Sequence, residues 1–350
     1  VVISLSDTLA LLIQLRCAVK KSSQLFRGLL VALVAGSAFA DATLLNVSYD
    51  VARDVYKDYN PMFQKYWKQK AGESIELKQS HGGSTKQVRA VSDGLEADVV
   101  TMNQANDIEF LAEKGLVAKD WAKKFPNNAS PYTSAMVFIV RKGNPKAIKD
   151  WSELAGTGVQ VIIPHPKNTG NGRNTYLSAW AWALKQPGGN DKTAQEFLGK
   201  MLKNAPLFAA GGRDATTTFM QRKMGDVLVT FESEAEMIAK EFGKGEFEVV
   251  YPSLTMQTEF PVAVVAKVVD KKGTRKQAQA YLDYLWSKEG QENAAQNYLR
   301  PRDPELLKKY AAQFPAIKTF TVDEVFGGAS KAFTVHFKDG GSFDQIYSQK

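Results

Sequence analysis

Cysteine and histidine are scarce in this chain of 350 residues, which has one cysteine and three histidines. Cys17 precedes the segment expected to form the mature protein, so we expect neither a disulfide nor thiol chemistry there. His81, His165 and His336 lie far apart in the sequence and lack the H-E-x-x-H spacing of a metal site, so we expect them to be capping or solvent-exposed residues. The sequence also has no G-x-S-x-G elbow. These absences predict a protein that is not an enzyme and that carries no metal or other cofactor.

Long apolar runs are also absent, and the apolar stretch at residues 28–34 is too short to span a bilayer. It follows a basic stretch at residues 20–27 and precedes an A-x-A site that ends at Ala40. This order is typical of a secretory signal peptide. We therefore expect cleavage after Ala40 and an exported mature chain of residues 41–350. Residues 1–18 fit no such signal, and we interpret them as sequence upstream of the true start.

Charge is spread along the chain rather than clustered. The chain has 45 lysines and arginines and 37 aspartates and glutamates, for a formal net charge of +8. This mild excess, without a basic cluster, predicts no nucleic-acid partner.

Strand-like and helix-like runs alternate along most of the chain. We expect strands at residues 43–48, 74–78, 97–102, 135–140, 159–163, 227–231 and 261–269. We expect helices at residues 51–70, 88–95, 105–114, 173–185, 192–203, 217–224 and 274–298. This alternation predicts an α/β architecture with mostly parallel sheets. A faint repeat between residues 94–101 and 223–230 is what two similar lobes would give.

Three glycine-rich loops each precede a predicted helix. The first, around Gly82, Gly83 and Ser84, follows a predicted strand, and Ser84 and Gln87 have the spacing of a capping box. The loops at residues 166–173 and 210–216 repeat this pattern. Free N–H groups and the positive end of the helix dipole make such a turn a site for an anion. The spacings of a P-loop and of a dinucleotide fingerprint are absent, so the three loops predict a shared anion site of another kind.

The chain resembles the sulfate/thiosulfate-binding proteins of bacterial ABC importers over almost the whole predicted mature part. The segments that carry the resemblance are residues 44–50, 79–84, 140–146, 225–228 and 298–302. The resemblance implies a two-lobed periplasmic binding protein fold of type II, with the ligand in the cleft between the lobes. One lobe would comprise residues 41–135 and 256–300 and the other residues 136–255, with residues 301–350 packing on both. It also implies a periplasmic monomer that delivers sulfate or thiosulfate to a permease in the inner membrane.

The resemblance also assigns ligand-binding residues by position. It implies hydrogen bonds to a dehydrated oxyanion from the backbone N–H groups of Asp50, Ser84, Gly170, Asn171 and Gly212 and from the hydroxyl of Thr169. Phe231 stands where the sulfate branch has a tryptophan whose indole N–H donates to the ligand. Phe231 and residues 169–171 look more like the thiosulfate branch, whereas Gly83 and the C-terminal segment look more like the sulfate branch. Both anions therefore stay open as the preferred ligand.

Two further alternatives also stay open at this point. A phosphate or molybdate type of oxyanion binder is one, because hydrogen phosphate needs a carboxylate acceptor and the side chain of Asp50 could supply it. The resemblance implies that the backbone of Asp50 binds instead. An exported enzyme that acts on phosphate or sulfate esters is the other alternative. The absence of a recognisable nucleophile, base and metal ligands argues against it.

Overall fold

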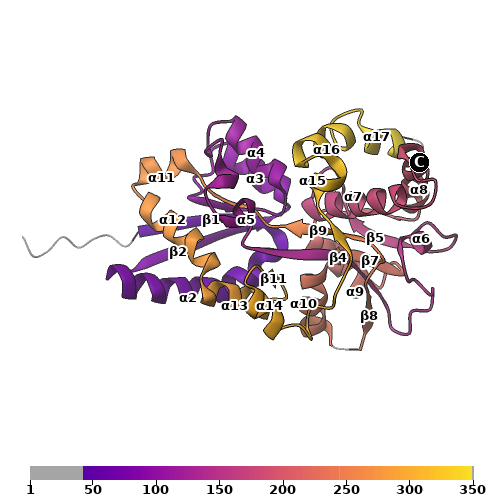
Figure 1. The fold of residues 1–350 in the computed structure, drawn as a ribbon, viewed down its shortest axis with the longest axis horizontal. Helices are drawn as coiled ribbons and strands as arrows, with labels where there is room; N and C mark the ends of the chain where they lie inside the picture. Colours follow the sequence, from indigo (N-terminus) through magenta and orange to yellow (C-terminus); the bar gives the residue numbers. More distant parts are fainter. Residues whose placement is uncertain (1–41, 244, 349–350) are drawn as a thin grey trace, which may run out of the picture. The chain divides into compact units, whose positions relative to one another are not determined.

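The computed structural model describes residues 42–243 and 245–348. The predicted signal peptide, its cleavage site after Ala40 and the predicted upstream segment lie outside these residues. The described strands form two sheets, and helices surround both of them (Figure 1). Within this part of the chain, no helix is long and apolar enough to cross a membrane.

The first sheet has the strand order β10-β3-β1-β2. Three of its strands, β1 (Ala42–Tyr49), β2 (Ile75–Gly82) and β3 (Val99–Thr101), run parallel, and β10 (Val262–Val264) is antiparallel to β3. In the register, Tyr49 lies opposite Gly82 and Ser48 lies opposite Thr101. The carboxyl ends of the three parallel strands therefore meet at one edge, where open α/β sheets bind ligands.

Helix α2 (Arg53–Ala71) follows a short 3-10 helix, η1 (Asp50–Ala52), and buries one stripe against this sheet. Its fully buried side chains recur at helical spacing, namely Val55, Tyr56, Tyr59, Phe63 and Trp67. Gly72 ends the helix with a φ of 73°, a left-handed conformation that favours glycine. The next helices are α3 (Ser84–Ser92), α4 (Ala105–Glu113), the 3-10 helix η2 (Trp121–Lys123) and α5 (Pro126–Ala129).

The second sheet has the order β12-β9-β4-β7-β5-β6, and β8 and β11 also pair with β4. Its strands are β4 (Tyr132–Arg141), β5 (Val161–Pro164), β6 (Phe208–Ala209), β7 (Val227–Phe231), β8 (Phe247–Val250), β9 (Thr255–Glu259), β11 (Arg300–Pro301) and β12 (Thr319–Phe320). Strand β4 is antiparallel to β7, β8, β9 and β11, whereas β5 is parallel to β6 and β7. The prediction of mostly parallel sheets is right for the first sheet and wrong for this mixed one. An apolar run such as β4 is buried on both faces and does not encode the direction of its neighbours.

Helices of the middle part pack around the second sheet. They are α6 (Trp151–Leu154), α7 (Gly170–Leu184), α8 (Asp191–Lys203), α9 (Gly212–Met220) and α10 (Glu232–Phe242). Helix α7 is buried along nearly its whole length. It begins three residues earlier than predicted, so the loop at residues 166–173 already contains its first turn.

The later part of the chain departs from two predictions. The predicted strand at residues 261–269 ends at Val264, and α11 (Ala266–Lys272) follows. The predicted long helix at residues 274–298 is divided into α12 (Arg275–Asp283), the 3-10 helix η3 (Tyr284–Trp286) and α13 (Lys288–Gln296). Ser287 breaks it because its hydroxyl caps α13 by accepting from the Gly290 amide at 3.0 Å. The remaining helices are α14 (Pro304–Lys309), α15 (Val322–Phe326), α16 (Ala329–His336) and α17 (Ser342–Tyr347).

Candidate anion-binding site

All seven residues that the sequence analysis assigns to the ligand line one small cavity of about 10 Å³. They are Asp50, Ser84, Thr169, Gly170, Asn171, Gly212 and Phe231. A space of this size admits about one water-sized sphere, so the walls lie close together. Asp50 and Ser84 follow strands of the first sheet, and the other five belong to loops and strands of the second. The structure therefore brings the predicted residues together, and their contact with a ligand stays a prediction.

The first glycine-rich loop opens α3 without a side-chain cap. Gly83 is the N-cap residue of this helix. The predicted capping box is wrong, because the Ser84 hydroxyl donates to the carboxylate of Asp107 and the Gln87 amide donates to Ser80 Oγ at 3.1 Å. Since no side chain caps the start of α3, its first N–H groups stay available to a ligand.

The second loop is held by Thr169, the N-cap residue of α7. Its Oγ1 accepts from the Gly172 amide and donates to the His165 carbonyl, both at 3.0 Å. The hydroxyl hydrogen therefore points to His165 in this conformation, and Thr169 shapes the loop from within. Gly170 and Asn171, the first residues of α7, have amides that donate to no other residue in the described part of the chain.

The third loop opens α9 and is joined to the first sheet by Asp50. The Asp50 Oδ2 atom accepts from the backbone amide of Arg213 at 3.1 Å. A Cβ on Gly211 would lie 3.1 Å from the same oxygen, so a glycine there lets the carboxylate approach. The side chain of Asp50 thus serves as an acceptor for α9, and Asp50 and Gly212 both line the cavity.

Glu234 is a cavity residue that the sequence analysis did not assign to the site. It is 1% exposed, and its carboxylate accepts from Asn171 Nδ2 at 3.3 Å and from the Thr230 hydroxyl. Burial raises the pKa of Glu234 to about 7, the bond from Thr230 lowers it, and the charge of Asp50 raises it. Near neutral pH this carboxyl is therefore protonated in a large fraction of molecules, which reduces the negative charge at the cavity wall.

Phe231 contributes an apolar wall. Its buried ring meets Phe260 edge-on with 5.6 Å between centroids, and Phe260 stacks on Tyr49 at 5.3 Å. The phenyl rings of Phe231 and Phe260 carry no hydrogen-bond donor. The cavity therefore offers donors from three loops and an apolar surface on the side of Phe231.

A buried ion pair links the first and second glycine-rich loops. Arg173 of α7 and Asp107 of α4 lie 3.2 Å apart, and their side chains are 2% and 4% exposed. Asp107 also accepts from the Ser84 hydroxyl at the start of α3. The starts of α3 and α7 are therefore joined through one carboxylate.

The histidines do not assemble into a metal site. Within the described residues, no group of three histidine, cysteine or acidic side chains could hold an ion. His336 was expected to be a capping or solvent-exposed residue, and that prediction is wrong. It is 4% exposed and packs against Trp180 at 4.6 Å and Phe326 at 5.5 Å.

Four more cavity residues escaped the sequence analysis, namely Tyr49, Val51, Asn103 and Gly211. Tyr49 and Asn103 had a usable signal, because each stands at or just after the carboxyl end of a parallel strand. Gly211 lies within the third loop but was not singled out there.

Comparison with known proteins places the chain in a family. A model described as bacterial extracellular solute-binding protein matches residues 47–300. The chain belongs to this solute-binding protein family. It is 63% identical to a thiosulfate-binding protein of Pseudomonas aeruginosa, over 89% of this chain and 94% of that protein. It is 51% identical to a sulfate-binding protein of Escherichia coli, over 91% of this chain and 97% of that protein.

Solved structures agree with this assignment. The sulfate-binding protein SubI from Mycobacterium tuberculosis matches with a TM-score of 0.76 and 29% identity, covering 84% of this chain and 98% of SubI. A periplasmic thiamin-binding protein matches with a TM-score of 0.65 at 18% identity, which shows the fold alone, over 89% of this chain and 98% of that one. The predicted α/β fold of a two-lobed periplasmic binding protein is confirmed. The relatives are named as binding proteins rather than enzymes.

Proposed function

We propose that this solute-binding protein captures sulfate and thiosulfate outside the inner membrane and delivers them to the permease of an ABC importer. The observation that carries the proposal is the convergence of three glycine-rich helix starts and η1 on one small cavity. The proposed ligand contacts are those of the seven predicted residues, and the Thr169 hydroxyl would turn from the His165 carbonyl to donate to the ligand. Close relatives that carry the names of sulfate- and thiosulfate-binding proteins support it.

The donors suit a fully ionised oxyanion. A charge-assisted hydrogen bond contributes roughly 1.5–3 kcal/mol, so five backbone donors would contribute about 8–15 kcal/mol. A micromolar dissociation constant corresponds to about 8 kcal/mol. A helix dipole adds only about 0.3–1 kcal/mol, so the amides themselves would supply most of the affinity.

Phosphate fits this site less well. A selective phosphate site needs a carboxylate acceptor for the proton that phosphate keeps at neutral pH. The carboxylate of Asp50 is engaged by the Arg213 amide, and that of Glu234 by Asn171 and Thr230. Each carboxylate therefore already accepts from donors of the protein, which leaves fewer of its lone pairs for the proton of hydrogen phosphate.

Thiosulfate is the second candidate for the preferred ligand. An indole N–H at position 231 would favour the fourth oxygen of sulfate, but Phe231 offers only an apolar ring. The terminal sulfur of thiosulfate is a weaker hydrogen-bond acceptor than an oxygen, so it loses less at such a wall. The 63% identical relative named as a thiosulfate-binding protein supports this preference. We place the terminal sulfur against Phe231 and the three oxygens toward the loops.

The proposed lobes are those of the sequence analysis. Residues 41–135 and 256–300 would form one lobe, residues 136–255 the other, and residues 301–350 would pack on them. The division of the strands into two sheets supports two lobes. The proposed boundaries at 135/136 and 255/256 fall within β4 and β9, which both pair in the second sheet. Ligand binding would favour the closed arrangement, in which both sides of the cavity contact the anion. A permease would then recognise the closed monomer.

Calorimetric titration of the purified chain with sulfate, thiosulfate and phosphate tests the proposal. We expect binding of the first two at micromolar or lower concentration and at least about 100-fold weaker binding of phosphate. Tight phosphate binding, or turnover of phosphate or sulfate esters by the same preparation, would overturn it. Fractionation of cells that express the full chain tests the proposed periplasmic location, and N-terminal sequencing of the exported form tests cleavage after Ala40.

A further inference from the structure

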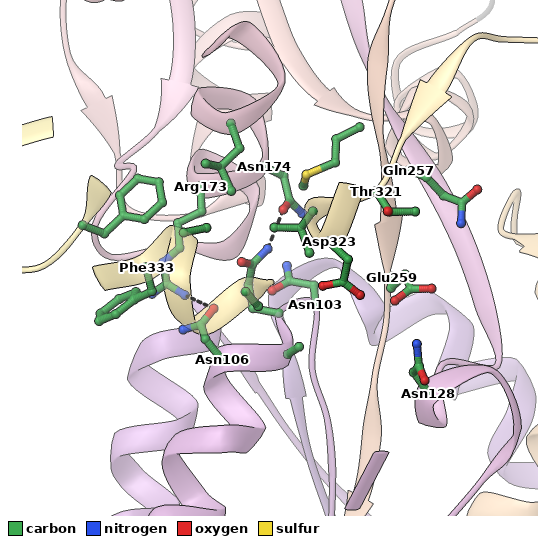
Figure 2. Close-up of a pocket in the computed structure, with 18 residues that line it drawn as sticks. Asn103, Asn106, Asn128, Arg173, Asn174, Gln257, Glu259, Thr321, Asp323 and Phe333 are labelled. Atoms are coloured by element: carbon green, nitrogen blue, oxygen red, sulfur yellow. Dashed lines mark hydrogen bonds between the residues drawn. The ribbon is translucent and has the colours of Figure 1, made fainter. Parts of the chain in front are cut away.

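Asn103 lies on the wall between two cavities. It follows strand β3, it is 4% exposed, and it lines the anion cavity. It also lines a second cavity of about 110 Å³, whose other polar residues include Asn174, Gln257 and Glu259 (Figure 2). Asn103 is therefore close to the anion cavity, but it lies outside the three glycine-rich loops.

The hydrogen-bonding capacity of this side chain is unused within the described part of the chain. Its Oδ1 is buried without a partner, and no described residue bonds to its amide group. The neighbouring amides each make at least one bond, because Gln104 Nε2 donates to Asn174 Oδ1 at 2.5 Å and Asn171 Nδ2 donates to Thr230 Oγ1 at 3.0 Å, although Asn171 Oδ1 and Asn174 Nδ2 are also buried without partners. A buried polar atom without a partner is unfavourable, so a group that satisfies this end of the Asn103 side chain should be present when the protein works.

Asn103 also reaches directly over the second loop. A Cβ added to Gly170 would lie 2.0 Å from Asn103 Oδ1 and 2.7 Å from its Cγ. The side-chain amide is thus packed against the backbone that carries the proposed donors Gly170 and Asn171. A ligand that accepts from those two amides would lie beside Asn103.

We infer that Asn103 is a further ligand-contacting residue, whose amide NH₂ donates to the bound oxyanion from the side of the first sheet. An oxyanion has only acceptors, so the amide nitrogen must face it, and rotation of the amide by half a turn exchanges its nitrogen and oxygen without changing its shape. This bond replaces the donor that Phe231 cannot supply. The inference rests on the proposed function, since it takes the cavity to be the oxyanion site.

Calorimetric titration of Asn103 variants with sulfate and thiosulfate tests this role. Asn103→Ala should weaken binding of both anions by about 10- to 100-fold, the usual range for a charge-assisted bond. Asn103→Asp has nearly the same shape but places a carboxylate where the donor stood, so it should weaken binding at least tenfold further. Gln257→Ala is the matched control, because Gln257 is an amide side chain that lines the second cavity and not the anion cavity.

A third variant separates a ligand contact from a packing role. If Asn103 only fills space, Asn103→Leu, which has a similar volume but no donor, should bind both anions as well as the wild type, and that result would overturn the inference. So would binding by Asn103→Ala within about twofold of the wild type. Thermal unfolding without ligand identifies any variant that fails to fold, and the remaining variants then decide. If the wild type binds neither anion, the proposed function itself fails and this inference fails with it.

Discussion

The carboxylate of Asp50 accepts a hydrogen bond from the backbone amide of Arg213, 3.1 Å away and 163 positions later in the chain. Asp50 follows a strand of the first sheet, and Arg213 stands in the first turn of α9 beside the second sheet. One side chain therefore caps a helix that belongs to the opposite side of the anion cavity. The two sides of the cavity are joined next to the proposed ligand.

Loss of this cap should weaken anion binding. Asp50→Ala keeps the backbone amide that we propose as a ligand donor but leaves the Arg213 amide without its acceptor, so affinity should fall about 10- to 100-fold. Asp50→Asn keeps an acceptor oxygen, so its anion affinity should fall clearly less than that of Asp50→Ala. Asp214→Ala is the control, because Asp214 accepts from the Ala210 amide at 3.0 Å within the same loop and does not reach the first sheet. Equal losses in Asp50→Ala and Asp214→Ala, measured by calorimetry, would contradict the prediction.

Gly170 and Gly83 should respond differently to an added methyl group. A Cβ on Gly170 would lie 2.0 Å from Asn103 Oδ1, whereas a Cβ on Gly83 would meet its nearest atom, the Ala210 carbonyl oxygen, at 3.6 Å. Gly170→Ala forces Asn103 to move, and overpacking of about 1–3 kcal/mol should raise the dissociation constant about 10- to 100-fold. Gly83→Ala makes an ordinary contact and should bind within about threefold of the wild type. The Asn103→Ala substitution removes the atoms that a Cβ at position 170 would meet. Adding Gly170→Ala to Asn103→Ala should therefore weaken binding less than adding Gly170→Ala to the wild type.

Much of the site could be predicted because its residues stand at positions that local sequence marks. Asp50 and Ser84 follow predicted strands, and Gly170 and Gly212 stand at or near predicted helix starts, where free amides are expected. Strongly apolar strands such as β3, β4, β5 and β7 were predicted, some with shifted bounds, whereas β6, β8, β9, β11 and β12 were not predicted. The fold class followed from their alternation with helices.

The features that the sequence analysis missed depend on partners that are distant in the sequence. The spacing of Ser84 and Gln87 predicted a local capping box, but Asp107, 23 positions later, takes the Ser84 hydroxyl instead. Glu234 and Asn171 are 63 positions apart, and no local pattern shows that they meet. The mixed direction of the second sheet has the same cause, because pairing of β4 with β7 and β9 is decided by tertiary connections rather than by the apolar run itself.

Phe231→Trp should shift the balance between the two anions. The indole would add an N–H donor at the apolar wall, worth about 1–3 kcal/mol to an oxygen that accepts it. The same ring is larger than the buried phenyl that packs on Phe260, so the variant should be less stable by about 1–3 kcal/mol. The ratio of sulfate to thiosulfate affinity, measured by calorimetry on one preparation, cancels most of the packing cost and should rise. A ratio equal to that of the wild type would show that position 231 affects packing alone.

Glu234→Gln should change how stability depends on pH. Burial raises the pKa of Glu234 from 4.5 to about 7, so between these two values the folded protein holds a proton that the unfolded chain has lost. Stability should therefore fall as pH rises from about 4.5 to 7, by about 3 kcal/mol in total, and this loss should be absent from Glu234→Gln. In urea unfolding, the free energy of unfolding of Glu234→Gln should therefore rise relative to that of the wild type as pH increases from 5 to 8.

Glu241→Gln removes the same charge from the same helix at a partly exposed position, where the side chain is 43% exposed. Its difference from the wild type should vary little over this range, because the charge is removed from a position in contact with solvent. Other titrating groups, such as His336, are present in all three proteins, so their contributions cancel in the comparison. A difference between Glu234→Gln and the wild type that stays constant from pH 5 to 8 would mean that Glu234 is ionised in the folded protein throughout. The cavity would then hold its anion against a full negative charge at this wall.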